Sequence, residues 1–241
     1  MLQGILGRKL GMTQIFDDDG RWVGVTVIEA GPCPVTQVKT AKTDGYNAVQ
    51  LGFGRRKRVT KAIAGHLAKS GVKEPVHYIR EFRLTQEPEV KQGDKVTLDV
   101  LKGIRKVDVI GITKGKGFQG VVKRWHKNCS PKTHGSMQQR AVGSASSAED
   151  PGHIRPGTMR PGHMGMERFT QKNLLIVKLD DARNLLLVRG AVPGPIGNYV
   201  IIQKSENQRV PVAAVEEVRT DRGKLAPKDK KKPVAAPAAK A

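Results

Sequence analysis

The chain has 241 residues and carries 43 lysines and arginines against 22 aspartates and glutamates, a formal net charge of +21. No run of about 18 apolar residues occurs, which excludes a membrane-spanning helix of the usual length. The first residues lack the apolar core of a signal peptide, and two cysteines are too few for a disulfide scaffold, so we expect a reducing cytoplasm. A positive excess of this size is best tolerated beside a polyanion. No amphipathic membrane-binding helix is found, so nucleic acid is the expected partner.

The first 55 residues predict short strands of a small β-barrel. Residues 23–28 are β-branched, and residues 34–40 alternate between apolar and polar with period two. Asp44 and Gly45 predict a hairpin turn before a further strand over 47–53. The acidic run at 17–20 predicts a turn between strands, because the twelve-residue calcium-loop pattern is missing.

Residues 55–94 predict a small α/β insertion. It opens with the basic run 55–58, and Thr60 is a suitable N-cap for a helix that ends at Gly71. A strand-like piece is expected over 79–84, followed by strands over 96–100 and 107–112.

Residues 114–172 differ from both neighbours. They hold eleven lysines and arginines, three carboxylates, nine glycines, four prolines and four of the six histidines, with almost no apolar periodicity. A segment this long without secondary structure is unusual in a compact domain, so we expect a partner outside the chain to order it. Apolar runs at 174–177, 185–188 and 199–202 then predict strands, which completes a globular part over 1–204. Residues 205–241 predict a basic, disordered tail.

Motifs for catalysis are weak. Residues 115–120 match the dinucleotide fingerprint GxGxxG, but no acidic residue ends a second strand about 20 positions later. His126, Cys129 and His134 lie close together, although without the spacing of a zinc finger. We therefore expect no enzyme, no cofactor and no metal. A nucleotide-dependent enzyme that acts on RNA and a general RNA chaperone remain as alternatives.

The composition of 114–172 favours a folded RNA that is recognised by shape. Aromatic residues are too few for the stacking sheets of single-strand modules, whereas arginines, lysines and glycines suit phosphate contacts and close backbone approach.

Seven stretches, in order, resemble the bacterial large-ribosomal-subunit protein three family over residues 1 to about 204. They cover 4–13, 30–34, 44–52, 115–125, 133–136, 162–165 and 184–194. The resemblance implies a six-stranded barrel like those of translation factors, a small α/β insertion, and a long extension that runs through 23S ribosomal RNA toward the peptidyl transferase centre. It also implies a role early in subunit assembly, proteins fourteen and nineteen of the same subunit as neighbours, and no enzymatic activity, small-molecule substrate or membrane contact.

The residues predicted to contact RNA are basic or aromatic side chains of three segments. Many family members carry a methylated glutamine where this chain has His163, which is expected near the tip of the extension. The predicted contacts are Arg8 and Lys9 of the barrel, the run Arg55, Arg56, Lys57 and Arg58, and the extension residues Lys114, Lys116, Lys123, Arg124, Trp125, His126, His134, Arg140, Arg155, Arg160, His163 and Arg168.

Overall fold

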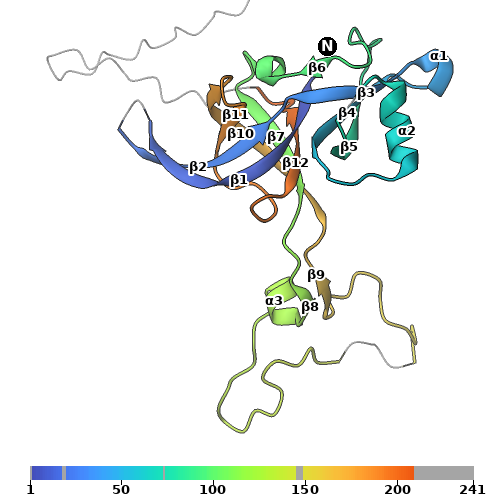
Figure 1. Ribbon diagram of the computed structural model, residues 1–241. Coiled ribbons are helices and arrows are strands. Elements are labelled where there is room, and N and C mark those ends of the chain that lie inside the picture. The colour runs from blue at the N-terminus through green and yellow to red at the C-terminus, as the bar shows by residue number, and fades with distance from the viewer. Residues whose placement is uncertain (1, 18–19, 73, 145–148, 209–241) are drawn as a thin grey trace, which may run out of the picture. The chain divides into compact units, whose positions relative to one another are not determined.

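The computed structural model describes residues 2–17, 20–72, 74–144 and 149–208. Six antiparallel strands close into a barrel in the order β1-β12-β7-β10-β11-β2 (Figure 1). This confirms the predicted mainly β class and the six-stranded barrel. The strand bounds are Gly4–Phe16 (β1), Trp22–Ala30 (β2), Lys106–Ile112 (β7), Arg168–Asp180 (β10), Leu185–Arg189 (β11) and Tyr199–Lys204 (β12).

The barrel interior is filled by apolar side chains, which alternate along the strands with residues that point outward. In β12, Val200 and Ile202 are fully buried, whereas the residues on either side of each are only partly buried. Ile28 and Leu186 are also fully buried. Removing a side chain of this size from water contributes about 1.5–3 kcal/mol. The alternation visible in the sequence therefore determines which face of each strand forms the core.

A second sheet has four strands in the order β5-β4-β3-β6. The bounds are Cys33–Lys39 (β3), Ala48–Arg55 (β4), Val76–Arg83 (β5) and Lys95–Val96 (β6), with helices at Ala41–Asp44 (α1) and Lys61–Lys69 (α2) and a 3₁₀ helix at Leu98–Leu101. The insertion expected over 55–94 covers only part of this layer, because 33–55 pairs here and not in the barrel. Local pattern predicts a strand but not which sheet it joins, since the pairing partners are distant in sequence.

The two sheets share one apolar core. Phe82 of β5 packs against Gly4 of β1, where a larger residue would collide with the ring. Cys33 is buried in the same core and its thiol donates to the Leu6 carbonyl oxygen at 3.4 Å. Burial raises the pKa of the Cys33 thiol to about 12, so this cysteine stays neutral and acts as a small apolar residue.

Two local predictions near these strands need correction. The turn at Asp44 and Gly45 is a loop containing the single turn α1, which ends where Gly45 takes φ of 81°. The strand expected over 96–100 is divided between β6 and the 3₁₀ helix, which buries Leu98 and Leu101. The helix predicted from Thr60 is confirmed as α2, although the Thr60 side chain makes no capping hydrogen bond.

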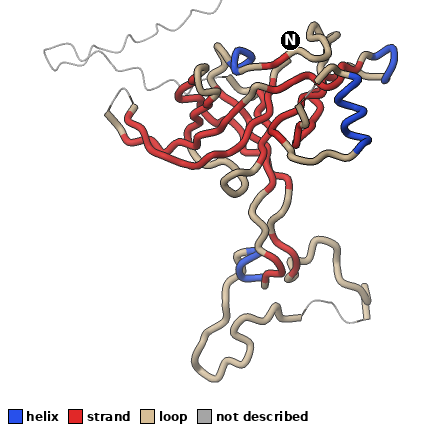
Figure 2. The backbone as a smooth tube through the Cα atoms, in the orientation of Figure 1, coloured by secondary structure: helices blue, strands red, loops and turns tan. Residues whose placement is uncertain are grey.

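The extension leaves the barrel after β7 and returns in β10, as Figure 2 shows. Its regular elements are β8 (Gly117–Gln119), α3 (Val121–Trp125) and β9 (Gly162–Met164). Between α3 and β9, residues 126–144 and 149–161 form no helix or strand. Residues 168–172 of the expected extension are the start of β10, because 168–171 pair with β7 in the barrel.

The first residues after β12 pack on the barrel. Ser205 is buried, and its hydroxyl donates to the Asn173 side-chain oxygen at 2.7 Å. The Gln208 side-chain amide donates to the Lys106 carbonyl oxygen at 2.8 Å. The predicted tail over 205–241 therefore begins with packed residues, and from 209 onward it lies outside the described residues.

Candidate RNA interface

Arg8 and Lys9 are neighbours in β1 but have opposite environments. Arg8 is exposed, opposite Tyr199 of β12. Lys9 is only 8% exposed, and its ammonium donates to the carbonyl oxygens of Val192 at 2.8 Å and Gly194 at 3.1 Å. Desolvation, together with the nearby charge of Lys114, lowers the pKa of Lys9. Adjacent residues of a strand point to opposite faces, so Lys9 supports the barrel and we remove it from the predicted interface.

The basic run 55–58 is an exposed connection at the end of β4. The Arg56 amide donates to the Pro75 carbonyl oxygen at 2.9 Å, which ties this connection to the residue before β5. Arg55 pairs with Val76 in the same ladder. Four positive side chains thus follow one another on a connection that is anchored at Arg55 and Arg56, an arrangement suited to neighbouring phosphates.

The two legs of the extension are joined at their root by backbone hydrogen bonds. The Thr113 amide donates to the Glu167 carbonyl oxygen and the Lys116 amide to the Met164 carbonyl oxygen, both at 2.9 Å. Beyond these bonds β8 and β9 pair antiparallel, with Phe118 opposite His163. His163 therefore lies at the root of the extension. The expectation of a position near the tip is wrong, because this strand pairing was not visible in the sequence.

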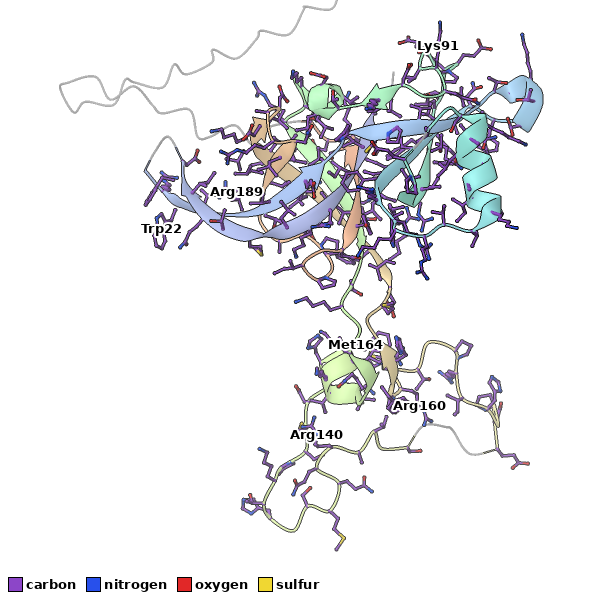
Figure 3. The ribbon with its side chains drawn as sticks, viewed as in Figure 1. Trp22, Lys91, Arg140, Arg160, Met164 and Arg189 are labelled. Carbon is purple, nitrogen blue, oxygen red and sulfur yellow. The ribbon has the colours of Figure 1, made fainter. Side chains whose placement is uncertain are left out.

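Side chains from α3 tie the second leg to the first. The Trp125 indole N–H and the Arg124 guanidinium both donate to the Arg160 carbonyl oxygen, at 2.9 Å and 3.0 Å. The Arg124 guanidinium also lies 5.0 Å from the centroid of the Trp125 ring. We call these three residues the clasp; Figure 3 labels Arg160 beside Met164 of β9. The Arg160 Nε is buried and has no hydrogen-bond partner among the described residues.

Glycines allow this close approach of the two legs. A Cβ at Gly162 would lie 2.6 Å from the Arg124 guanidinium, and a Cβ at Gly165 would collide with the Lys114 carbonyl oxygen. Gly165 also has φ of 80°, a conformation that L-residues rarely adopt.

The root contains an open cleft of about 450 Å³. Both legs contribute to its lining, and five of the predicted residues meet there: Lys114, Lys116, Arg124, Trp125 and His163. Glu167 is the one carboxylate in this lining, so the cleft is positive. It combines cations, a tryptophan and an imidazole, which are the groups that bind phosphates and stack on bases.

The remaining predicted residues of the extension are dispersed. Lys123 and His126 lie exposed in and directly after α3, while His134, Arg140 and Arg155 are exposed in the outer loop. Arg168 is exposed at the start of β10, opposite Ile112. Figure 3 labels Arg140 on the outer loop. A few local bonds shape this loop, such as that from the Ser130 amide to the Gln139 carbonyl oxygen at 3.0 Å.

The structural context of the GxGxxG match does not fit a dinucleotide site. That site needs a parallel strand–helix–strand unit. Here β8 pairs antiparallel with β9, and the helix that follows has five residues. Among the described residues no group of three histidine, cysteine or acidic side chains is arranged to hold a metal ion. In the same part of the chain, no helix is both long and apolar enough to span a bilayer.

One group that sequence reasoning missed is a ring contact between sheets. Tyr199 of β12 stacks on Tyr78 and His77 of β5. The residues are more than 120 positions apart and no local signal connects them. Arg80, whose guanidinium lies 4.8 Å from the Tyr78 ring centroid, was missed for the same reason.

Fold and charge together define the class: a basic β-barrel protein with a looped extension whose root is a positive cleft. A family model described as ribosomal protein L3 matches residues 80–184. The chain is 47% identical over 206 residues to large ribosomal subunit protein uL3 of Dehalococcoides mccartyi, which covers 85% of this chain and 99% of the relative. The chain is also 49% identical to uL3 of Solibacter usitatus, which covers 86% of this chain and 100% of the relative. It is 48% identical to uL3 of Gloeobacter violaceus, which covers 86% of this chain and 97% of the relative.

The chain therefore belongs to the uL3 family of large-subunit ribosomal proteins. The family resemblance found in the sequence is confirmed. Membership makes the chain a structural component of the large ribosomal subunit in the bacterial cytoplasm.

Proposed function

We propose that the chain binds 23S ribosomal RNA directly, nucleates early assembly of the large subunit, and directs its extension toward the peptidyl transferase centre. The observation that carries this proposal is the root cleft, where both legs of the extension bring Lys114, Lys116, Arg124, Trp125 and His163 together. The exposed run 55–58 supplies further positive charge, and Arg8 of the barrel is an exposed cation that has the Glu29 carboxylate 3.8 Å away.

The exposed charges and irregular backbone of the outer loop support a partner outside the chain. Residues 126–144 and 149–161 have no helix or strand, and their charged side chains are largely exposed. Most binding energy on RNA comes from release of counterions by lysine and arginine, which does not require a preformed protein core. The clasp then directs the loop from a defined root.

Binding to 23S ribosomal RNA as a function of salt tests the cleft. Each phosphate contact contributes about 0.7–0.9 to the slope of log K against log salt. The double substitution Lys114→Gln and Lys116→Gln should therefore lower the slope by about 1.4–1.8. Lys91→Gln, which removes an exposed lysine outside the predicted interface, is the matched control and should leave the slope unchanged. An unchanged slope in the double variant would contradict the cleft assignment, and equal affinity for unrelated RNAs would favour a general chaperone.

Shortening the extension tests its direction. A variant that replaces residues 127–159 by a short glycine–serine linker keeps the clasp residues. We expect it to sediment with large subunits that are slower in peptide bond formation. Normal rates in salt-washed subunits containing this variant would contradict an extension that reaches the catalytic centre.

The neighbours proposed from the resemblance are large-subunit proteins fourteen and nineteen. Cross-linking of salt-washed subunits with a short lysine-reactive reagent, followed by peptide identification, should link exposed lysines of this chain to both. Links to other proteins alone would contradict this choice.

A further inference from the structure

Three aromatic rings and an imidazole meet where the edge of the second sheet touches the barrel. The Tyr199 ring stacks on Tyr78 with centroids 5.3 Å apart and planes at 9°, and on His77 with centroids 4.9 Å apart and planes at 20°. The buried Phe53 presents its edge to Tyr199 at 6.0 Å and 82°. Two of the chain's three tyrosines are in this group.

The backbone around Tyr199 is shaped to accept its ring. Gly54 has φ of 72°, and a Cβ there would lie 2.9 Å from the Tyr199 ring. Because Gly54 has no side chain, Tyr199 lies directly against β4 and contacts both consecutive residues of β5. The rings are therefore held in place by the meeting of two sheets, before any ligand arrives.

His77 is the exposed member of this group. β5 is the edge strand of its sheet, and His77 is exposed while Tyr78 is half-buried and Phe53 is buried. Tyr199 covers the imidazole from one side. The exposed part of His77 is thus a flat surface whose orientation is fixed by a stacked neighbour.

Positive charge surrounds this surface. The Arg56 amide is bonded to Pro75, two residues before His77, which places the run 55–58 beside it. On the barrel side Arg8 pairs with Tyr199 across β1 and β12, and its guanidinium lies 3.8 Å from the Glu29 carboxylate, which offsets its charge. Glu74 adds one exposed carboxylate to the connection before β5, against four cations in 55–58.

We propose that His77 is a stacking platform for one unpaired nucleobase of the RNA, with Arg55 and Arg56 placed for the flanking phosphates. Unpaired bases stack on aromatic and histidine rings, and cations alongside hold the backbone. A single free ring accommodates one base. No side chain of the platform offers a hydrogen-bond pattern that selects among bases, so the site tolerates any base. This proposal rests on the proposed RNA-binding function and deepens it.

The test compares substitutions at one position in the full chain, with 23S ribosomal RNA as the probe. Base stacking is worth about 1–3 kcal/mol, so His77→Ala should weaken binding about fivefold or more. The slope of log K against log salt should not change, because no phosphate contact is removed. His77→Phe should restore affinity. His77→Leu should not, since leucine covers Tyr199 but provides no π-face.

Each result has one meaning. Unchanged affinity in His77→Ala overturns the platform, and so does rescue by His77→Leu, which would show a purely structural cover for Tyr199. A reduced salt slope in His77→Phe would indicate a phosphate contact and also contradict stacking. Failure of the unsubstituted chain to bind 23S ribosomal RNA would overturn the proposed function itself, a result distinct from all of these.

Discussion

The barrel and the outer loop of the extension belong to one chain but obtain their conformations differently. Each barrel strand is hydrogen-bonded to two neighbours and buries apolar side chains such as Leu6 and Ile28 completely. Residues 126–144 and 149–161 have neither strand nor helix, and Met137 there is 98% exposed. The difference teaches that the barrel's shape is determined by its own core, whereas the outer loop follows its course without one.

The root of the extension lies between these extremes. It has only the short pair β8–β9, yet backbone bonds and the clasp join its legs. Precise local contacts replace a core here, and they hold the positive cleft in one geometry.

The largest expected effect separates core from loop. Leu6→Ala should lower the free energy of unfolding by about 2–5 kcal/mol, because it leaves a cavity among fully buried side chains. Met137→Ala removes an apolar side chain from the outer loop and should leave the value unchanged. Urea unfolding of the two variants measures both. A comparable loss in Met137→Ala would show that the loop packs against the barrel in solution.

The next effect separates two cations with different tasks. Lys9→Met should cost about 1–3 kcal/mol of stability, since two buried carbonyl oxygens lose their donor. It should not change the salt slope of RNA binding. Arg56→Met should do the reverse, with normal stability and a slope lower by about 0.7–0.9. Thermal unfolding together with binding at several salt concentrations checks the pair, and a slope change in Lys9→Met would return it to the interface.

A smaller effect tests the root with two matched glycines. Gly165 and Gly157 both have φ of 80°, so alanine costs about 1–2 kcal/mol of local strain at either. Only Gly165 faces the Lys114 backbone, while Gly157 has open space around it. Hydrogen exchange at the Thr113 and Lys116 amides should therefore accelerate in Gly165→Ala and stay slow in Gly157→Ala. Equal exchange in both variants would show that close packing does not hold the legs together.

The smallest effect is pH-dependent and lies in the second sheet. The Lys39 ammonium, 2.9 Å from the Glu81 carboxylate, and the Tyr46 hydroxyl lower the pKa of Glu81. A lowered carboxyl pKa adds stability above the unfolded pKa, and this stability is lost as pH falls through the folded pKa. Glu81→Gln should thus cost about 1 kcal/mol or less near pH 7, because the pair is partly exposed, and nothing in strong acid.

The control for this pair is Glu149→Gln in the extension. Glu149 is exposed and forms no ion pair among the described residues. The free energy of unfolding of Glu149→Gln should therefore equal that of the unsubstituted protein at every pH. Urea unfolding from acid to neutral pH measures both variants. A constant offset for Glu81→Gln over that range would assign its effect to packing rather than charge.

Local pattern predicted the barrel strands because apolar alternation is decided by neighbouring residues, as in Tyr199–Lys204. It also predicted α2 from Thr60 and the segment without periodicity. It placed 33–55 in the barrel, and it gave no sign that Lys9 is buried. The position of His163, expected near the tip from the resemblance, was also wrong. All three depend on which distant strand or carbonyl lies opposite. The five basic and aromatic residues of the cleft were predicted as RNA contacts, although their meeting in one place was not.

The sequence by itself determined that this is a basic, mainly β protein of the large ribosomal subunit with a long polar extension. Composition, apolar alternation and the order of the family motifs are properties of the amino-acid sequence alone. Only the tertiary structure decided which cation is buried, where the two legs meet, and that Tyr199 lies against His77. Each of these depends on contacts between residues far apart in sequence. Such contacts form only when the barrel and the second sheet pack around a shared core.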